Sequence, residues 1–302
     1  MTLSQSLLVQ FSAALAAQSA AAGRSLVAIR FNANRHLTAI AWRADVLVTS
    51  EQSLPDLDAF EIVAGDGAIR RATPAGRDPG TNIAVLRISD ALPVESLTAA
   101  RAQSGALALA YGADGHGGVR SRIGVVNLVG PEWHSQAGGR IDERVVLDME
   151  LSHVEEGGPV LDASGAFVGM STFGPRGQVM LIPAATIERV VPLLLRDGRV
   201  ARGWLGLAMQ PVAVPDSLHE AAGQRSGMMV MSIVEGGPAA NAGVVAGDIL
   251  LTIDDAPARR IHQLGARLDV DRIGKEIELR LIRSGTVTAV RAVIAARPLT
   301  AA

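Results

Sequence analysis

A succession of short apolar segments, separated by turn-forming residues, occupies the chain from about Ser25 to Pro183. The clearest segments are SLVAIRF, VLVTS, IAVLRI, GALALAYG, GVVNLVG, RVVLDMEL, AFVGMSTF and QVMLIP. Glycine, proline and aspartate separate them, as at Asp78–Pro79–Gly80 and Gly138–Gly139. Short strands at regular spacing with such turns are typical of antiparallel barrels and sandwiches. The sequence therefore predicts a mostly β domain over this region.

Helical patterns lie on both sides of this domain. Residues 1–24 carry apolar side chains at the spacing of an amphipathic helix, namely Leu3, Leu7, Leu8, Phe11 and Leu15. The segment PAATIERVVPLLLRDGRV predicts one helix that ends near Gly198. Residues 202–297 mix strand-like segments with a helix around IHQLGARLDV, which predicts an α+β domain. The predicted organisation is an N-terminal helical segment (1–24), a β domain (25–198) and a second domain (202–297).

The composition excludes several classes of function. The 302 residues include 28 Lys and Arg against 30 Asp and Glu, so there is no basic excess for nucleic acid or a membrane surface. There is no cysteine, which excludes disulfides, thiol nucleophiles and cysteine metal sites. No segment reaches 18 apolar residues, so we predict no membrane span.

The N-terminus lacks the pattern of a secretory signal. Such a signal needs a basic start followed by an unbroken apolar run. Here the first basic residue is Arg24, and polar residues between Ser4 and Ser12 interrupt the apolar run. We therefore expect a cytoplasmic location for the chain as written, or a periplasmic one if a leader was removed.

The second domain contains a loop suited to a peptide's C-terminus. The segment GWLGLAM (203–209) is followed by GMMVMSIVEGGPAANAGVVAGDILLTIDD (227–255), and together they closely resemble a PDZ domain of the bacterial protease type. This resemblance implies that Trp204, Leu205, Gly206 and Leu207 form the carboxylate-binding loop. Ala208 and Met209 would begin the strand that pairs with the peptide. The helix near Gln263–Leu268, with Leu264 and Leu268, would form the other wall of the groove. The alternative is that the loop is only a tight turn against the core.

The β domain, together with the helix and the domain after it, resembles an HtrA-type serine protease. VLVTSEQSL resembles a segment that usually ends Val-Thr-x-x-His-Val, and TNIAVLRI resembles Thr-Asp-(Leu/Ile)-Ala-Val-Leu-(Lys/Arg)-Ile. LDMELSHVEEGGPVLDASGAFVGM resembles the segment that carries Gly-Asn-Ser-Gly-Gly-Pro. The resemblance implies a chymotrypsin-like double β-barrel followed by a PDZ domain.

The catalytic positions of that family carry other residues here. Gln52 stands at the histidine position, Asn82 at the aspartate position and Glu156 at the serine position. Acyl transfer by the family's mechanism needs a nucleophile, a base and a carboxylate that orients the base. The oxyanion loop is altered too, with Val154 in place of a glycine and Glu155 in place of the usual asparagine. We therefore predict a pseudoprotease, that is, a chain that is not an enzyme, with no cofactor.

Three arrangements around these positions have chemical consequences. Ser152 and His153 are neighbours on the chain, and neighbours on extended backbone point to opposite faces, so we expect no shared proton. The acidic run of Asp148, Glu150, Glu155 and Glu156 has no known metal-ligand spacing, and we expect a solvated rim and no metal. We also expect Gln52 to donate a hydrogen bond to Glu156 across the old cleft.

The function predicted from the sequence is binding of peptides or protein C-termini through the PDZ domain, as an adaptor or regulatory partner. The resemblance also implies that the chain forms a homotrimer or assembles with an active protease. Two alternatives stay open: an active HtrA-type serine endopeptidase with unusual catalytic residues, and a purely structural subunit whose groove is blocked by its own chain.

Overall fold

The computed structural model describes residues 2–32, 35–94, 97–259 and 266–298. The chain separates into two compact units, each with its own core. The first comprises Met1–Trp133 and Ile141–Val200, and the second comprises His134–Arg140 and Ala201–Ala302.

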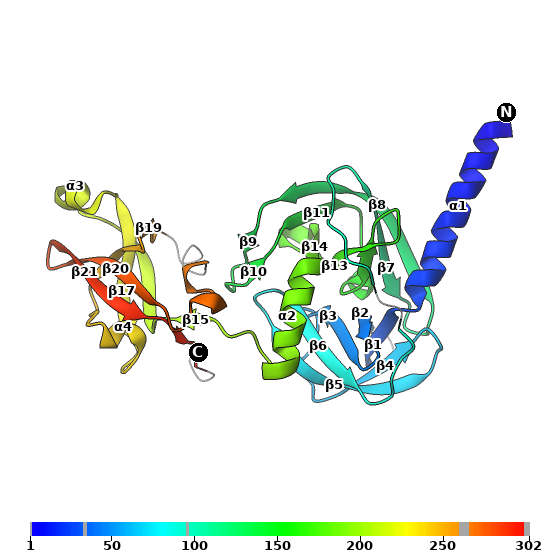
Figure 1. The fold of residues 1–302 in the computed structure, drawn as a ribbon, viewed down its shortest axis with the longest axis horizontal. Helices are drawn as coiled ribbons and strands as arrows, with labels where there is room; N and C mark the ends of the chain where they lie inside the picture. Colours follow the sequence, from blue (N-terminus) through cyan, green and yellow to red (C-terminus); the bar gives the residue numbers. More distant parts are fainter. Residues whose placement is uncertain (1, 33–34, 95–96, 260–265, 299–302) are drawn as a thin grey trace. The chain divides into compact units, whose positions relative to one another are not determined.

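The first unit contains two closed six-stranded antiparallel barrels (Figure 1). The first barrel has the strand order β1-β2-β3-β6-β5-β4. Its strands are β1 (Leu26–Asn32), β2 (Arg35–Arg43), β3 (Val46–Ser50), β4 (Phe60–Ala64), β5 (Ile69–Asp78) and β6 (Ile83–Ile88). Alternate residues such as Ile29, Leu37 and Leu47 fill its interior, as the period of two in a strand requires.

The second barrel has the strand order β11-β14-β13-β12-β7-β8. Its strands are β7 (Leu107–Ala113), β8 (Val119–Gly130), β11 (Arg144–Asp148), β12 (Pro159–Leu161), β13 (Phe167–Phe173) and β14 (Val179–Pro183). Val48 and Ile83 of the first barrel share a core with Tyr111 and Phe167 of the second, so apolar packing joins the two barrels. The mostly β, chymotrypsin-like fold class predicted from the sequence is confirmed.

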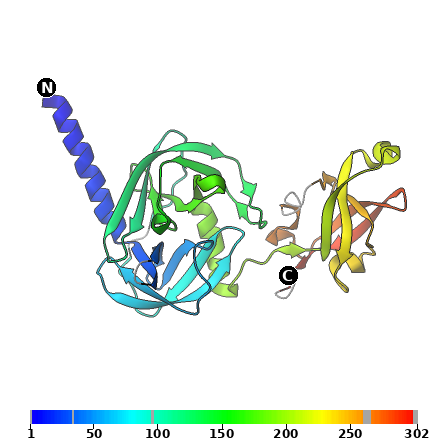
Figure 2. The ribbon, with the colours of Figure 1, turned by 180° about the vertical axis from the view of Figure 1, so that it is seen from behind.

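Helix α2 (Ala184–Asp197) closes the barrel unit. It lies against strands of both barrels (Figure 2). Its buried side chains, Ile187, Val190, Val191 and Leu194, recur at helical spacing and belong to the core that the barrels share. It ends at Gly198, whose φ of 71° allows the left-handed cap that stops a helix. The helix and its predicted end are both confirmed.

Helix α1 (Thr2–Gly23) confirms the predicted N-terminal helix and extends it. Alanine, the strongest helix former, makes up much of its second half. Leu15 packs against the barrel core, and the Gln18 amide donates to the carbonyl of Ala163. Leu7 and Leu8, however, are exposed, so these apolar side chains are not buried against the barrels as an amphipathic helix would suggest. No helix in the described part of the chain is both long and apolar enough to cross a membrane.

The second unit is built on an antiparallel sheet with the order β16-β17-β18-β20-β21, and β19 pairs with β18. Its strands are β16 (Leu207–Ala213), β17 (Ser226–Ile233), β18 (Ile249–Ile253), β19 (Ala256–Pro257), β20 (Glu276–Arg283) and β21 (Thr286–Val293). Short helices α3 (His219–Ala222) and α4 (Pro238–Asn241) and the two-stranded pair β15 (Gly203–Trp204) and β22 (Ala295–Ala296) complete it. Two further short strands, β9 (Trp133–His134) and β10 (Arg140–Ile141), pair with each other.

Candidate functional site

The structure brings Gln52, Asn82 and Glu156 together. Gln52 follows β3, Asn82 precedes β6, and Glu156 lies between a 3₁₀ turn (His153–Glu155) and β12. β3 and β6 are neighbours in the first barrel, whereas Glu156 belongs to the second. The site therefore forms where the two barrels meet, from residues about 30 and 100 positions apart in the chain.

Glu156 is the centre of a buried polar network. Its residue is only 1% exposed, and its Oε1 accepts from Ser50 Oγ (2.8 Å), Gln52 Nε2 (2.6 Å) and Thr172 Oγ1 (3.0 Å). Its Oε2 accepts from the hydroxyl of Ser53. Among the residues that the structure describes, Glu156 forms no ion pair, so these hydrogen bonds offset the cost of burying the carboxylate. The predicted bond from Gln52 to Glu156 is confirmed.

Asn82 holds the same network from the other side. Its Oδ1 accepts from the backbone N–H of Gln52 (2.7 Å) and from Ser50 Oγ (3.1 Å), while its Nδ2 donates to Thr172 Oγ1 (2.7 Å). Its backbone is left-handed, with a φ of 56°, which asparagine tolerates better than most residues. Asn82 therefore fixes the turn that presents Gln52.

Gly157 and Gly158 are required by close backbone contacts. A Cβ on Gly157 would lie 2.3 Å from the carbonyl oxygen of Thr38, and the φ of Gly157 is +82°. A Cβ on Gly158 would lie 1.9 Å from the carbonyl oxygen of Tyr111. Backbone atoms cannot move aside as a flexible side chain can. The glycines let the loop that carries Glu156 lie directly against strands β2 and β7.

Val154 and Glu155 lie in a loop whose backbone groups bond within the loop or to neighbouring strands. The N–H groups of residues 155–158 donate to the carbonyls of Ser152 (2.9 Å), His153 (3.4 Å), Ser171 (3.0 Å) and Glu155 (3.3 Å), in that order. The carbonyl of Val154 accepts from Thr38 Oγ1 at 2.6 Å. In serine proteases the N–H at the nucleophile position faces the substrate oxyanion. In this chain the equivalent N–H of Glu156 is used within the turn.

Ser152 and His153 do not interact through a hydrogen bond. Within the described residues, Ser152 Oγ is buried and has no hydrogen-bond partner. The ring of His153 instead packs against Phe173, with 5.0 Å between ring centroids. The expectation that these neighbours share no proton is confirmed. The described side chains also contain no group of three or more metal-binding residues arranged to hold an ion. The expected solvated acidic rim is wrong for half of its members, because Glu155 and Glu156 are buried while Asp148 and Glu150 are exposed.

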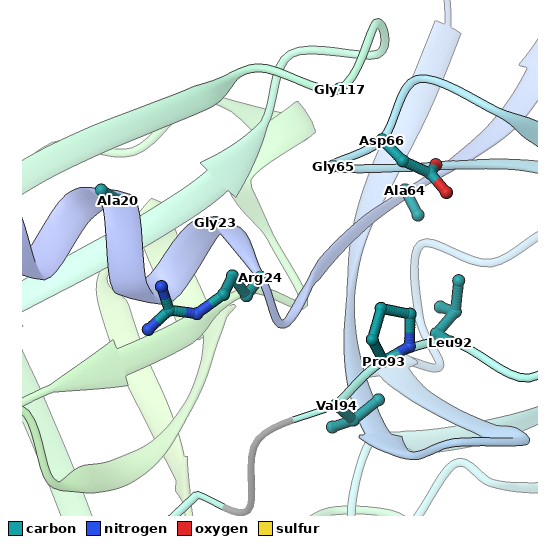
Figure 3. A pocket seen from close by; sticks show the side chains of 10 residues that line it. All are labelled: Ala20, Gly23, Arg24, Ala64, Gly65, Asp66, Leu92, Pro93, Val94 and Gly117. Atoms are coloured by element: carbon teal, nitrogen blue, oxygen red, sulfur yellow. The ribbon is translucent and has the colours of Figure 1, made fainter.

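Two of the cavities in the described part of the barrel unit lie beside polar or charged side chains. One of about 530 Å³ borders the polar network and is lined by Phe31, Arg35, His36, Leu37, Gln52, Ser53, His153 and Val154. The other, of about 450 Å³, lies between the end of α1 and the turn after β4 (Figure 3). Arg24 and Asp66 line this second cavity, and the neighbouring Arg70 guanidinium lowers the pKa of the Asp66 carboxyl to about 2. None of the predicted site residues lines it.

The loop Trp204–Leu207 is the one predicted to bind a carboxylate. Gly206 has a φ of +77°, and the carbonyls of Leu205 and Gly206 accept from the N–H groups of Ala239 and Val234, both at 2.9 Å. In the described residues, no acceptor is found for the N–H groups of Leu205 and Gly206. Both carbonyls are thus turned into the unit, and two donors remain for a ligand.

A cavity of about 390 Å³ lies beside this loop. Leu205, Leu207, Met209, Ile253 and Leu268 give it apolar walls, and segment 136–138 and Arg297 also line it. Among the described residues, strand β16 pairs only with β17 and forms an edge of the sheet, so its other side is open there for an added strand. Ala208 and Met209 lie on this strand as predicted. Leu264 and the start of the predicted helix lie outside the described residues, and Ala266–Leu268 form a 3₁₀ turn.

Sequence reasoning missed four residues of the barrel site. Ser50 and Ser53 flank Gln52 closely, and Thr172 lies on β13, yet no motif marks any of them as a partner of Glu156. Arg122, on β8, pairs with Glu155 at 3.0 Å. The spacing of the two serines around Gln52 was the one available signal.

The fold and the two sites define a class of protein: a trypsin-like double barrel followed by a PDZ domain. A family model described as "Trypsin-like peptidase domain" matches residues 37–170, and a "PDZ domain" model matches residues 203–293. The chain therefore has the HtrA-type fold, as the sequence motifs predicted.

Several relatives match most of the chain. A "Probable periplasmic serine endoprotease DegP-like" of Rhizobium meliloti is 29% identical over 248 residues, which cover 79% of this chain and 49% of the relative. "Serine endoprotease DegS" of Escherichia coli K12 is 28% identical over 227 residues, which cover 70% and 62%. The chain thus spans about half the length of the DegP-like relatives that it matches.

Solved structures share the fold as well. "HtrA-type protease AlgW with decapeptide" aligns with a TM-score of 0.72 and 24% identity, covering 94% of this chain and 99% of that one. "HtrA-type protease AlgW with tripeptide" aligns with a TM-score of 0.69 and 26% identity, covering 93% and 97%.

These comparisons correct two predictions. The prediction that the chain is not an enzyme is contradicted, because the relatives are named serine endoproteases. It rested on the residue types at three positions, and residue types alone do not establish the activity of a site. The expected cytoplasmic location is not supported either, since the DegP-like relatives are named periplasmic, which agrees with the stated alternative.

Proposed function

We propose that the second unit binds peptides or protein C-termini that end in a free carboxylate and an aliphatic residue. The observation that carries this proposal is the loop Trp204–Leu207, where the N–H groups of Leu205 and Gly206 have no acceptor in the described residues. The carboxylate binds at these donors, and the last side chain enters the apolar cavity beside them. The upstream residues pair with the open edge of β16.

The titration of matched peptides tests this function. A peptide with a free carboxylate should bind the full chain about 10- to 150-fold more tightly than the same peptide with an amidated terminus. This range corresponds to the roughly 1.5–3 kcal/mol that hydrogen bonds to a charged group contribute. Calorimetry with both peptides measures the difference, and a peptide with an acidic last residue serves as the control for the apolar cavity. Equal affinities of the acid and the amide would reject this function.

Endopeptidase activity in the barrel cleft is a second candidate function, favoured by the names of the relatives. One pair of side chains in the structure supports this activity. The hydroxyl of Ser53 donates to the Glu156 carboxylate, and Ser53 also lines the 530 Å³ cavity. A hydroxyl beside a proton acceptor at a cavity is the basic requirement for a nucleophile. Ser50 and Thr172 also donate to Glu156, but both are buried.

A casein assay with matched variants tests the second candidate. If Ser53 attacks and Glu156 takes its proton, Ser53→Ala and Glu156→Gln should each reduce turnover by at least about 100-fold, since both roles belong to one step. Glu150→Gln is the control, because this exposed carboxylate lies in the same segment outside the network. If turnover survives Ser53→Ala, Ser53 is not the nucleophile. If the unaltered chain shows no turnover, endopeptidase activity is rejected.

The compartment and the assembly of the chain belong to the proposal as well. Its DegP-like relatives, 29% identical, are named periplasmic, which supports a periplasmic location for the chain. The chain itself forms a homotrimer or assembles with an active protease. Sedimentation of the purified chain, alone and mixed with a DegP-like protease, measures both.

A further inference from the structure

The peptide groups of β16 face its neighbour β17 and the open edge of the sheet in alternation. Val230 of β17 donates its N–H to the carbonyl of Asp248 at 2.8 Å, and its own carbonyl accepts from the N–H of Gly247 at 2.9 Å. These groups of Val230 are therefore turned to the β18 side, away from β16. Opposite residues of an antiparallel pair either exchange two hydrogen bonds or turn away from each other. Met209, which pairs with Val230, thus turns its N–H and carbonyl to the open edge.

Leu207 and Pro211 face the same edge. The Val234 N–H bonds to the carbonyl of Gly206, next to Leu207, at 2.9 Å, so the groups of Leu207 itself point the other way. The register with β17 is regular from Met209 to the end of β16, so Pro211, two residues after Met209, also points to the open edge.

Pro211 interrupts the row of donors along this edge. Proline has no backbone N–H, and inside a sheet it occurs where this group would face away from the partner strand. Its ring carbon Cδ stands where the amide proton would be, so an acceptor oxygen at the usual ~2.9 Å from the nitrogen would overlap the ring. The edge therefore offers N–H and carbonyl groups at Leu207 and Met209, but no donor at the exposed Pro211.

We propose that Pro211 limits recognition by this groove to the last four residues of a C-terminus. The inference rests on the peptide binding proposed above. A peptide that ends at the carboxylate-binding loop runs antiparallel to β16, with its last residue beside Leu207, its third-last opposite Met209 and its fifth-last opposite Pro211. The third-last residue exchanges two hydrogen bonds with Met209. The fifth-last residue meets the proline ring, so the peptide turns away from β16 there and residues further upstream add nothing to the affinity.

Peptides of increasing length test this limit on the full chain. Acetylated peptides of four, six and eight residues, all with a free carboxylate and a terminal valine after alternating serine and alanine, are titrated by calorimetry. The two longer peptides should bind within about twofold of the shortest. Pro211→Ala restores the donor, so the six-residue peptide should then bind about fivefold more tightly than the four-residue one, the factor for one added hydrogen bond. Pro215→Ala, at an exposed proline beyond the end of β16, is the matched control and should keep the length dependence of the unaltered chain.

Methylation of the peptide backbone gives a second measurement that needs no variant. N-methylation of the third-last residue removes its hydrogen bond to the Met209 carbonyl, so it should weaken the eight-residue peptide at least about fivefold. N-methylation of the fifth-last residue should leave the affinity of the unaltered chain within about twofold. The same methyl group should weaken binding to Pro211→Ala, where this residue pairs with the strand.

Two results would overturn the limit at Pro211. One is a gain of about fivefold or more between the four- and six-residue peptides in the unaltered chain, and the other is equal length dependence in Pro211→Ala and Pro215→Ala. Either result leaves the proposed function intact, because that function is decided by the comparison of acid and amide peptides. Equal affinities of the acid and the amide would reject both.

Discussion

Glu156→Ala is expected to lower the free energy of unfolding of the barrel unit by about 2–4 kcal/mol. The substitution removes the common acceptor of Ser50, Gln52, Ser53 and Thr172. It leaves buried donors without a partner and a void at the junction of the two barrels. Because the donors come from both barrels, the loss should weaken the junction itself. Urea unfolding followed by tryptophan fluorescence measures the change.

Two controls make this expectation specific. Glu156→Gln keeps the size of the side chain and one acceptor oxygen, so it should cost less than the alanine variant. Glu150→Ala removes an exposed carboxylate of the same segment and should change stability by less than about 0.5 kcal/mol. If Glu156→Ala behaved like Glu150→Ala, the polar network would not hold the barrels together.

Gly206→Glu is expected to weaken binding of a carboxylate-ending peptide by about 10- to 150-fold, since the loop would lose hydrogen bonds to a charged group worth roughly 1.5–3 kcal/mol. The φ of Gly206 is +77°, a conformation that strains any other side chain. A Cβ there would also lie 3.2 Å from the Trp204 ring and 3.4 Å from Cβ of Val234. Calorimetry with the full chain measures the affinity.

The expected cause is steric, and matched variants identify it. Gly206→Gln should weaken binding about as much as Gly206→Glu, because obstruction does not depend on charge. Gly243→Glu introduces the same residue at a similar φ of +78°, where nothing lies within 4 Å of the new Cβ. This control should bind normally. A large difference between the glutamine and glutamate variants would indicate charge repulsion instead.

Most of the architecture could be predicted because it depends on local patterns. Alternating apolar residues and glycine-containing turns define the strands of both barrels, and the end of α2 at Gly198 follows from one glycine. The apolar spacing in α1 correctly predicted a helix. It did not predict that Leu7 and Leu8 are exposed, because burial depends on a surface that the pattern does not contain.

The positions of Gln52, Asn82 and Glu156 follow from the sequence alone, since each stands at a fixed place in a motif. What surrounds them was decided by the tertiary structure. Ser53 and Thr172 meet at Glu156 only because two barrels close and pack against each other, and Arg122 reaches Glu155 only because Gly112 leaves a gap in the neighbouring strand. Strand register and barrel closure are long-range properties, so the partners of a buried charge cannot be determined from the residues next to it in the chain.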